Sequence, residues 1–266
     1  MGYVFEFSDA AGYDAWFEKA RNRYVFDLEI RLLAEMLSPA SGSRLLDIGC
    51  GTGKSLEALL NLDCHNLQVT GIDPSQYMLD IAKQRLGNRA DLYRGFAEDL
   101  PFEDNAFDHA LLFTTLEFTE KPAKAIEEAC RVAKDRVFIV ALNRYAPMNI
   151  VNIIKAWFTS STISRARCFS VWELKQIVFD ILGRVPISWR TTPQFPWVRG
   201  RIPLFFEKRF LVQKSPFGAT IGMAISPVPK FRIRPMSLKI KKTGQCKPVT
   251  GFAREKKEET YEDAYF

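Results

Sequence analysis

A glycine-rich segment between a predicted strand and a predicted helix constrains this chain more than any other feature. Residues 45–54 read LLDIGCGTGK, with an apolar run before the glycines and a helical pattern after them. Gly49, Gly51 and Gly53 allow the backbone to turn tightly and to approach a ligand, because glycine has no Cβ in the way. A loop of this kind after a first strand is typical of nucleotide-binding α/β folds.

The pattern around this loop predicts strands that alternate with helices. Five apolar runs have the length of strands: 44–48, 67–72, 92–96, 107–113 and 137–142. Three segments between them have helical character: 54–62, 75–86 and 122–133. This alternation favours a parallel sheet with helices on both faces. The nearly continuous apolar run VFIVAL at 137–142 also suits a strand that is buried on both sides.

The rest of the chain divides into a domain and a tail. We expect one domain over 1–226, with an N-terminal helical cap at 1–40 and a helical insertion at 146–182. Apolar residues recur at helical spacing through the first 37 residues. Residues 227–266 contain many lysines and little apolar pattern, so we expect a basic, loosely held tail.

Local signals place further elements after the parallel core. Residues 147–158 are predicted to form a helix in the insertion. Ser170 and Glu173 have the spacing of a capping box at the start of another helix. Segments 185–191 and 219–225 are candidate strands, separated by a proline-rich stretch that should be largely loop.

Composition excludes several classes of protein. The chain has 266 residues, of which 47% are hydrophobic and 26% charged, as in ordinary soluble domains. Its five cysteines include no C-x-x-C pair, which disfavours a zinc site and a secreted disulfide framework. The chain shows neither a signal-peptide pattern nor 18 consecutive apolar residues, so we expect a cytoplasmic protein without a membrane span.

The charge of the chain is distributed unevenly. The net charge is +6, but residues 184–254 contain fifteen basic side chains and a single acid, Glu207. A basic segment of this kind can contact nucleic acid or an anionic membrane, and it can equally be a solvated tail. Residues 227–254 are the candidates for this contact, and they lie outside every motif that indicates ligand binding or catalysis.

The glycine loop does not fit two common phosphate-binding motifs. A P-loop would need a glycine at position 48, where the chain has Ile48. A dinucleotide site needs G-x-G-x-x-G, whereas the glycines here follow G-x-G-x-G. Asp47 precedes the first glycine by two residues and disfavours a diphosphate. An acid at this place suits a ligand that carries a cation, such as the ammonium group of an amino acid.

A second acid lies at the end of the next predicted strand. Asp73, in the sequence GIDPS at 71–75, occupies the place where an acid accepts hydrogen bonds from ribose hydroxyls. The ligand would then combine a ribose with an ammonium group and would need no diphosphate. S-adenosylmethionine has these features.

With these motifs in place, the sequence resembles the class I S-adenosylmethionine-dependent methyltransferases. It is most similar to the type 11 branch, which includes the ubiquinone and menaquinone biosynthesis methyltransferases. The resemblance covers about residues 44–142 and rests on three ordered motifs: 45–53, 71–75, and 97–108 with the strand after it. It implies a Rossmann-like, doubly wound sheet of seven strands with the last strand antiparallel, the final pair being 185–191 and 219–225.

The resemblance also implies which residues contact S-adenosylmethionine. Those positions are Asp47, Gly49, Cys50, Gly51, Gly53, Asp73, Pro74, Ser75, Met78, Ala97, Glu98 and Phe113. One position departs from the family pattern. Phe96 stands where the family usually has Asp or Asn reaching the adenine amine, so Glu98 or Asp99 takes that contact or Phe96 only packs.

The implied reaction is methyl transfer to a small-molecule acceptor, mainly by positioning the reactants for an in-line displacement. No motif in the sequence identifies a general base. Glu117, just past the fourth predicted strand, is the one candidate, and it can equally cap the next helix. The alternative to an enzyme is a non-catalytic cofactor-binding or scaffold protein of the same fold, with its basic tail on an anionic partner.

Aromatic residues of the cap and insertion suggest an aromatic or lipidic acceptor, although such residues are usually core. The substrate-side candidates are Tyr13, Trp16, Trp157, Arg165 and Arg167.

Overall fold

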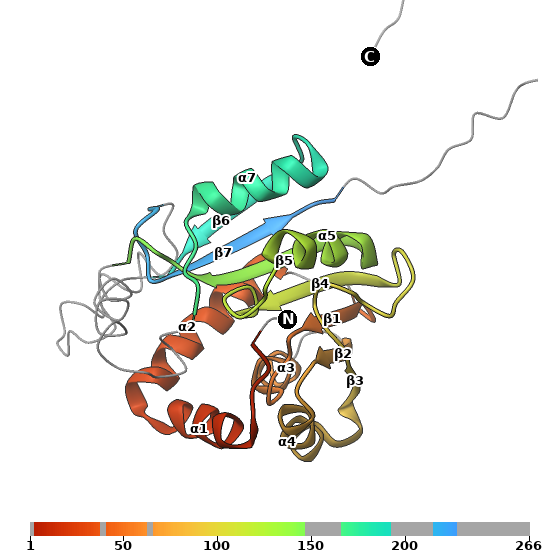
Figure 1. Cartoon of the computed structure of the whole chain (residues 1–266), viewed down its shortest axis with the longest axis vertical. Helices are drawn as coiled ribbons and strands as arrows, with labels where there is room; N and C mark the ends of the chain where they lie inside the picture. The colour runs from red at the N-terminus through yellow and green to blue at the C-terminus, as the bar shows by residue number, and fades with distance from the viewer. Residues whose placement is uncertain (1–2, 38–40, 63–65, 147–165, 193–214, 228–266) are drawn as a thin grey trace, which may run out of the picture. The chain divides into compact units, whose positions relative to one another are not determined.

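Seven strands form one mixed sheet at the centre of the molecule. They are β1 (Arg44–Ile48), β2 (Gln68–Asp73), β3 (Ala90–Arg94), β4 (Phe107–Phe113), β5 (Ala133–Leu142), β6 (Ile187–Thr191) and β7 (Thr220–Ile225). Their order in the sheet is β3-β2-β1-β4-β5-β7-β6 (Figure 1). β7 is antiparallel to β5 and β6, and the other neighbouring strands are parallel. The expected seven-stranded sheet with an antiparallel last strand is confirmed.

Helices cover both faces of this sheet. The computed structural model describes residues 3–37, 41–62, 66–146, 166–192 and 215–227. The helices are α1 (Phe7–Glu18), α2 (Ala20–Leu37), α3 (Lys54–Leu60), α4 (Gln76–Leu86), a 3₁₀ turn η1 (Gly87–Arg89), α5 (Pro122–Val132) and α7 (Val171–Leu182). One face packs against α5 and α7, and the other packs against α2, α3 and α4 (Figure 1).

The helix ends follow local sequence signals. Ser75 caps α4 by accepting a hydrogen bond from the amide of Met78 at 3.3 Å. Ser170 caps α7 by accepting one from the amide of Glu173 at 3.1 Å. The Glu173 carboxylate forms ion pairs with Arg167 and Arg144. The predicted N-cap of α7 is therefore confirmed.

Several predicted boundaries differ from the structure. Residues 7–37 form two helices in place of the single helix expected over the first 37 residues, because the Lys19 carbonyl accepts from the amides of Asn22 and Arg23 and so starts a new helix. β3 ends at Arg94, since Phe96 turns out of the strand and bridges to Asp99. The helix predicted at 147–158 and the tail after residue 227 lie outside the described residues.

Candidate functional site

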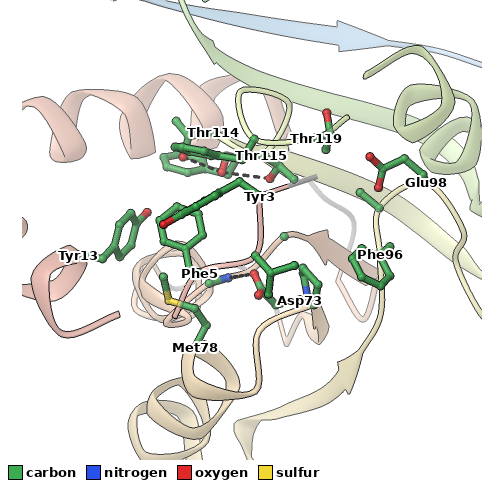
Figure 2. A pocket seen from close by; sticks show the side chains of 17 residues that line it. Tyr3, Phe5, Tyr13, Asp73, Met78, Phe96, Glu98, Thr114, Thr115 and Thr119 are labelled. Carbon is green, nitrogen blue, oxygen red and sulfur yellow. Dashed lines mark hydrogen bonds between the residues drawn. The ribbon is translucent and has the colours of Figure 1, made fainter. Parts of the chain in front are cut away.

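A cavity opens at the carboxyl ends of β1, β2 and β4 (Figure 2). The four segments that follow β1, β2, β3 and β4, together with the N-terminal segment, line it. Eight of the predicted cofactor contacts line it: Gly49, Gly51, Asp73, Pro74, Met78, Ala97, Glu98 and Phe113. The switch between β1 and β4 in strand order is where open α/β sheets bind ligands.

The glycine loop is pinned between β2 and the segment after β4. The amides of Gly49 and Cys50 both donate to the Ile72 carbonyl, at 2.7 and 3.1 Å. Gly49 has φ of +76°, and a Cβ there would lie 2.3 Å from the Cγ2 atom of Thr115. The hydroxyl of Thr115 donates to the Ile48 carbonyl at 2.7 Å. Only glycine fits at this position without moving the neighbouring loop.

Asp73 joins this loop to the start of α4. One carboxylate oxygen accepts from the Gly51 amide at 2.9 Å, and the other accepts from the Ser75 amide at 2.9 Å. The side chain is buried but still lines the cavity, and burial raises the pKa of Asp73 to about 6. Each carboxylate oxygen can accept a further hydrogen bond, so Asp73 has acceptor capacity left for ligand hydroxyls.

Asp47 lies beneath the glycine loop and does not itself line the cavity. It is fully buried, and one carboxylate oxygen accepts from the Ser55 hydroxyl at 2.6 Å. Its other oxygen, Oδ1, has no hydrogen-bond partner. Burial, with a smaller contribution from Asp73, raises the pKa of Asp47 to about 7. Burial also raises the pKa of the neighbouring Cys50 thiol, which makes that thiol an inert packing group.

Four apolar residues of the lining come from the segments that follow β2 and β3, and we call them the apolar slot. They are Pro74, Met78, Phe96 and Ala97, of which Phe96 is 36% exposed. The carboxylate of Glu98 accepts hydrogen bonds from the amides of Glu120 and Lys121, which precede α5. An aromatic ring therefore stands where the family pattern has an acid or amide.

Arg131 on α5 holds the loop that follows this slot. Its guanidinium donates to the carbonyls of Leu100 and Phe102, at 3.0 and 2.7 Å. It also pairs with Glu128, whose carboxylate accepts from the Leu100 amide at 3.0 Å. These bonds fix the position of the loop that presents Phe96 to the cavity.

The N-terminal segment forms part of the cavity wall, which sequence reasoning missed. The Tyr3 amide donates to the Phe118 carbonyl at 3.0 Å, and the Ser75 hydroxyl donates to the Phe5 carbonyl at 2.6 Å. The segment therefore runs from the loop after β4 to the start of α4. Figure 2 shows Tyr3, Phe5 and Tyr13 on the side of the cavity opposite Phe96. The aromatic residues at alternate positions 3 and 5 are the signal that could have indicated this wall.

The substrate-side candidates have separate positions. Tyr13 lines the cavity; burial raises its pKa above the ordinary value, and its hydroxyl bonds to Thr114. Arg167 is exposed, pairs with Glu173 at 2.8 Å, and is not among the lining residues. The side chain of Trp16 is not described, and Trp157 and Arg165 lie outside the described residues.

Glu117 is buried behind the cavity wall and is not one of its lining residues. It is 2% exposed, and its Oε1 atom accepts from the Leu142 amide at 2.6 Å. Burial, with a contribution from Glu29, raises the pKa of Glu117 to about 7. It does not cap α5, whose N-cap residue is Lys121.

The described residues contain neither a metal-binding cluster nor a membrane-spanning helix. Among them, no cluster of three or more His, Cys, Asp or Glu side chains is arranged to hold a metal ion. None of the described helices has the length and apolarity required to cross a membrane.

Comparison with known proteins links this geometry to a family. Residues 46–141 match the family model described as a methyltransferase domain. This match assigns residues 46–141, about a third of the chain, to the methyltransferase domain family. An uncharacterized protein of Methanocaldococcus jannaschii is 39% identical over 125 residues, covering 47% of this chain and 54% of that protein. A demethylmenaquinone methyltransferase of Staphylococcus aureus is 33% identical over 129 residues, covering 48% of this chain and 50% of that protein. The chain thus spans about half the length of these curated relatives.

Solved methyltransferases share the fold. A possible histamine N-methyltransferase of Thermotoga maritima aligns over 84% of this chain and 97% of that chain, with a TM-score of 0.67 and 23% identity. Magnesium protoporphyrin IX methyltransferase of Synechocystis, solved with bound S-adenosylhomocysteine, aligns over 81% of this chain and 94% of that chain, with a TM-score of 0.55 and 16% identity. At these identities the likeness concerns the fold of the methyltransferase domain alone.

Proposed function

We propose that this protein binds S-adenosylmethionine in the cavity and transfers its methyl group to a small-molecule acceptor. The observation that carries the proposal is the hydrogen bond between the Gly51 amide and Asp73 at the cavity rim. It joins the glycine loop of the first motif to the acid of the second at one place. The third motif contributes Ala97 and Glu98 to the same cavity.

The residues present fit the parts of this cofactor. Asp73 has acceptor capacity for ribose hydroxyls, and the slot of Pro74, Met78 and Phe96 suits the flat adenine ring. The unpartnered Oδ1 atom of Asp47 lies buried beneath the glycine loop, and its negative charge favours a cationic ligand above it. Of the twelve predicted contacts, Asp47, Cys50, Gly53 and Ser75 would act from behind the wall.

Positioning would supply most of the catalysis. The cofactor brings a methyl group already activated on a sulfonium, so the protein has to align the acceptor with it. Alignment of this kind supplies up to about 7–11 kcal/mol of a barrier. The segment at Tyr3 and Phe5 would help to exclude water from the cavity by covering it between the Phe118 carbonyl and the Ser75 hydroxyl.

The demethylmenaquinone methyltransferases among the relatives support a small acceptor. The fold itself does not establish the reaction, since the [4+2]-cyclase SpnF shares it with a TM-score of 0.53. SpnF is 21% identical, and the alignment covers 75% of this chain and 80% of that chain. The alternative to an enzyme is a non-catalytic protein of the same fold that binds the cofactor.

Calorimetry with S-adenosylmethionine and S-adenosylhomocysteine tests the proposal. Both should bind at micromolar concentration, and Asp73→Ala should weaken both about tenfold or more because a charged acceptor is lost. Asp91→Ala, at an exposed position on β3, is the matched control and should leave both affinities unchanged. Absence of binding at millimolar ligand would refute the proposal. Transfer of labelled methyl groups to a metabolite extract separates the enzyme from the non-catalytic alternative.

A further inference from the structure

Aromatic rings form one wall of the cavity. We call Tyr3, Phe5, Tyr13 and Phe118 the aromatic wall. Phe5 contacts each of the other three edge-on, with ring centroids 5.0–6.2 Å apart. All four line the cavity. Packed rings of this kind bind flat apolar groups, and their faces attract organic cations.

The charges on the cavity lining are all negative. Among the described residues that line it, the charged ones are Asp73 and Glu98, and none is Lys, Arg or His. Lys54 lies 4.7 Å from the ring centroid of Phe17 and is not one of the lining residues. A carboxylate or phosphate on the acceptor would find no described cation here, whereas an ammonium group would be favoured.

Two buried carboxyl groups, Glu29 and Glu117, lie behind this wall, and we call them the carboxyl pair. The Oε1 atom of Glu117 accepts from the Leu142 amide at 2.6 Å. Glu29 accepts from the Thr220 hydroxyl, also at 2.6 Å. Leu142 and Thr220 stand directly opposite each other in the β5–β7 ladder, so the two carboxyls approach one pair of neighbouring residues.

The carboxyl pair has an unused acceptor, and no cation among the described residues acts on it. Glu29 and Glu117 are 7% and 2% exposed, and the Oε2 atom of Glu117 is buried without a hydrogen-bond partner. Burial raises the pKa of each carboxyl to about 7, and no positive group contributes to either shift. A buried polar atom left unpaired in a native protein requires an explanation, and a ligand that donates to it is one.

Tyr13 connects the carboxyl pair to the cavity. Its ring belongs to the aromatic wall, its hydroxyl bonds to Thr114, and Glu29 is the largest charge that acts on it. From the other side, Glu117 acts on the Cys168 thiol, whose pKa burial raises to about 11. Arg144, the nearby cation on that side, is committed to the Cys168 carbonyl and to Glu173.

We propose that the methyl acceptor is an arylalkylamine, bound with its ring on the aromatic wall and its amino group directed toward the carboxyl pair. This inference rests on the proposed function and specifies its substrate class. Before transfer, the bound ammonium gives one proton to the carboxyl pair, which frees the nitrogen lone pair. That lone pair forms the new N–C bond while the C–S bond breaks and its electrons remain on sulfur. The product leaves as the methylated ammonium, and the carboxyl pair then loses its proton to water.

Three small probes of one shape test the class of acceptor by calorimetry with saturating S-adenosylhomocysteine. They are 2-phenylethylamine, 2-phenylethanol and phenylacetate, which are cationic, neutral and anionic at neutral pH. We expect the amine to bind about tenfold more tightly than the alcohol, and phenylacetate to bind weakest. Equal binding of the three, or tighter binding of phenylacetate, would overturn the inference.

The pH dependence of the unmodified protein gives a test that needs no variant. The carboxyl pair is protonated below pH 7 and ionised above it, while an alkylamine with a pKa of about 10 stays charged. Affinity for 2-phenylethylamine should therefore rise about tenfold between pH 5.5 and 8, and affinity for 2-phenylethanol should not. A flat profile for the amine would contradict the role of the carboxyl pair.

Variants then assign the effect to residues. Asp73, which lines the cavity and has a pKa of about 6, also contributes to the pH dependence. Glu29→Gln and Glu117→Gln should each reduce that dependence, while Glu127→Gln, on the exposed face of α5, should preserve it. Retained binding of S-adenosylhomocysteine shows that a variant is folded. Loss of that binding in the unmodified protein would refute the proposed function itself. Its retention without preference for the amine would refute only the inference on the acceptor.

Discussion

The guanidinium of Arg85 on α4 donates to the carboxylate of Asp14 on α1 at 2.5 Å, across 71 positions of sequence. The same carboxylate accepts from the Thr52 hydroxyl at 2.9 Å, and Arg85 also donates to the Thr52 carbonyl. Both side chains are largely buried. The N-terminal cap is therefore fastened to the glycine loop and to α4 at one point.

Asp14→Ala should release this fastening. We expect the free energy of unfolding to fall by about 1–3 kcal/mol, because charged hydrogen bonds to Arg85 and Thr52 are lost. Urea denaturation measures this change, and hydrogen exchange should show faster opening of α1. Asp80→Ala on α4 removes an exposed carboxylate paired with Gln76 and should cost about 0.5 kcal/mol or less. Similar losses in the two variants would contradict the fastening.

Gly49→Ala should disrupt the glycine loop. The added Cβ would lie 2.3 Å from Thr115, and φ of +76° is unfavourable for alanine. The expected cost is about 3 kcal/mol of stability, together with loss of S-adenosylhomocysteine binding. Gly42→Ala separates the two causes, because Gly42 has φ of +79° but no atom within 4 Å of an added Cβ. It should cost about 1–2 kcal/mol and leave binding intact.

Phe96→Ala tests the aromatic ring that departs from the family pattern. Its removal should weaken S-adenosylhomocysteine binding about five- to tenfold, because the ring lines the slot assigned to adenine. Phe179→Ala on α7 is the matched control, since the two phenylalanines are 36% and 38% exposed. Calorimetry measures the affinity of both variants for S-adenosylhomocysteine. Unchanged affinity in Phe96→Ala would mean that adenine binds elsewhere.

Buried carboxyls should make the fold less stable at alkaline than at mildly acidic pH. Burial raises the pKa of Glu117 to about 7 from an unfolded value of about 4.3, so the native state holds more protons between these values. The stability present below pH 4 is therefore lost progressively as pH rises through 7.

Glu117→Gln isolates the contribution of this carboxyl. Its amide oxygen can still accept from the Leu142 amide, but the side chain cannot ionise. We expect the variant to be more stable than the unmodified protein at pH 8, and this advantage to be about 2 kcal/mol smaller at pH 5.5. Denaturant titrations at both pH values provide the measurement. A variant that is less stable at pH 8 would mean that the ionised form is stabilised in the fold.

The sequence predicted the parts of the molecule that depend on local patterns. Strand β4 begins and ends as expected, and Ser170 caps α7 where its spacing to Glu173 indicated. The cofactor side of the cavity follows the motifs for the same reason, since each motif directly follows a strand. The antiparallel position of β7 came from the family resemblance, because strand order cannot be read from periodicity.

The acceptor side of the cavity was not predictable in this way. Glu29 and Thr220 are 191 positions apart, and only the pairing of β7 with β5 brings them together. Tyr3 and Phe5 join the wall through backbone hydrogen bonds that any residue type can make. The anionic contact through residues 227–254 and the cytoplasmic location stay predictions.

The antiparallel course of β7 also affects how such a protein can diversify. Because β7 runs opposite to its neighbours, its first residue, Thr220, lies at the same edge of the sheet as Leu142 and Thr191, the last residues of β5 and β6. The connections that follow β5 and β6 therefore start at the same edge of the sheet as the glycine loop. Under the proposed function, insertions there would alter which compound is methylated while the residues that hold the methyl donor are inherited unchanged.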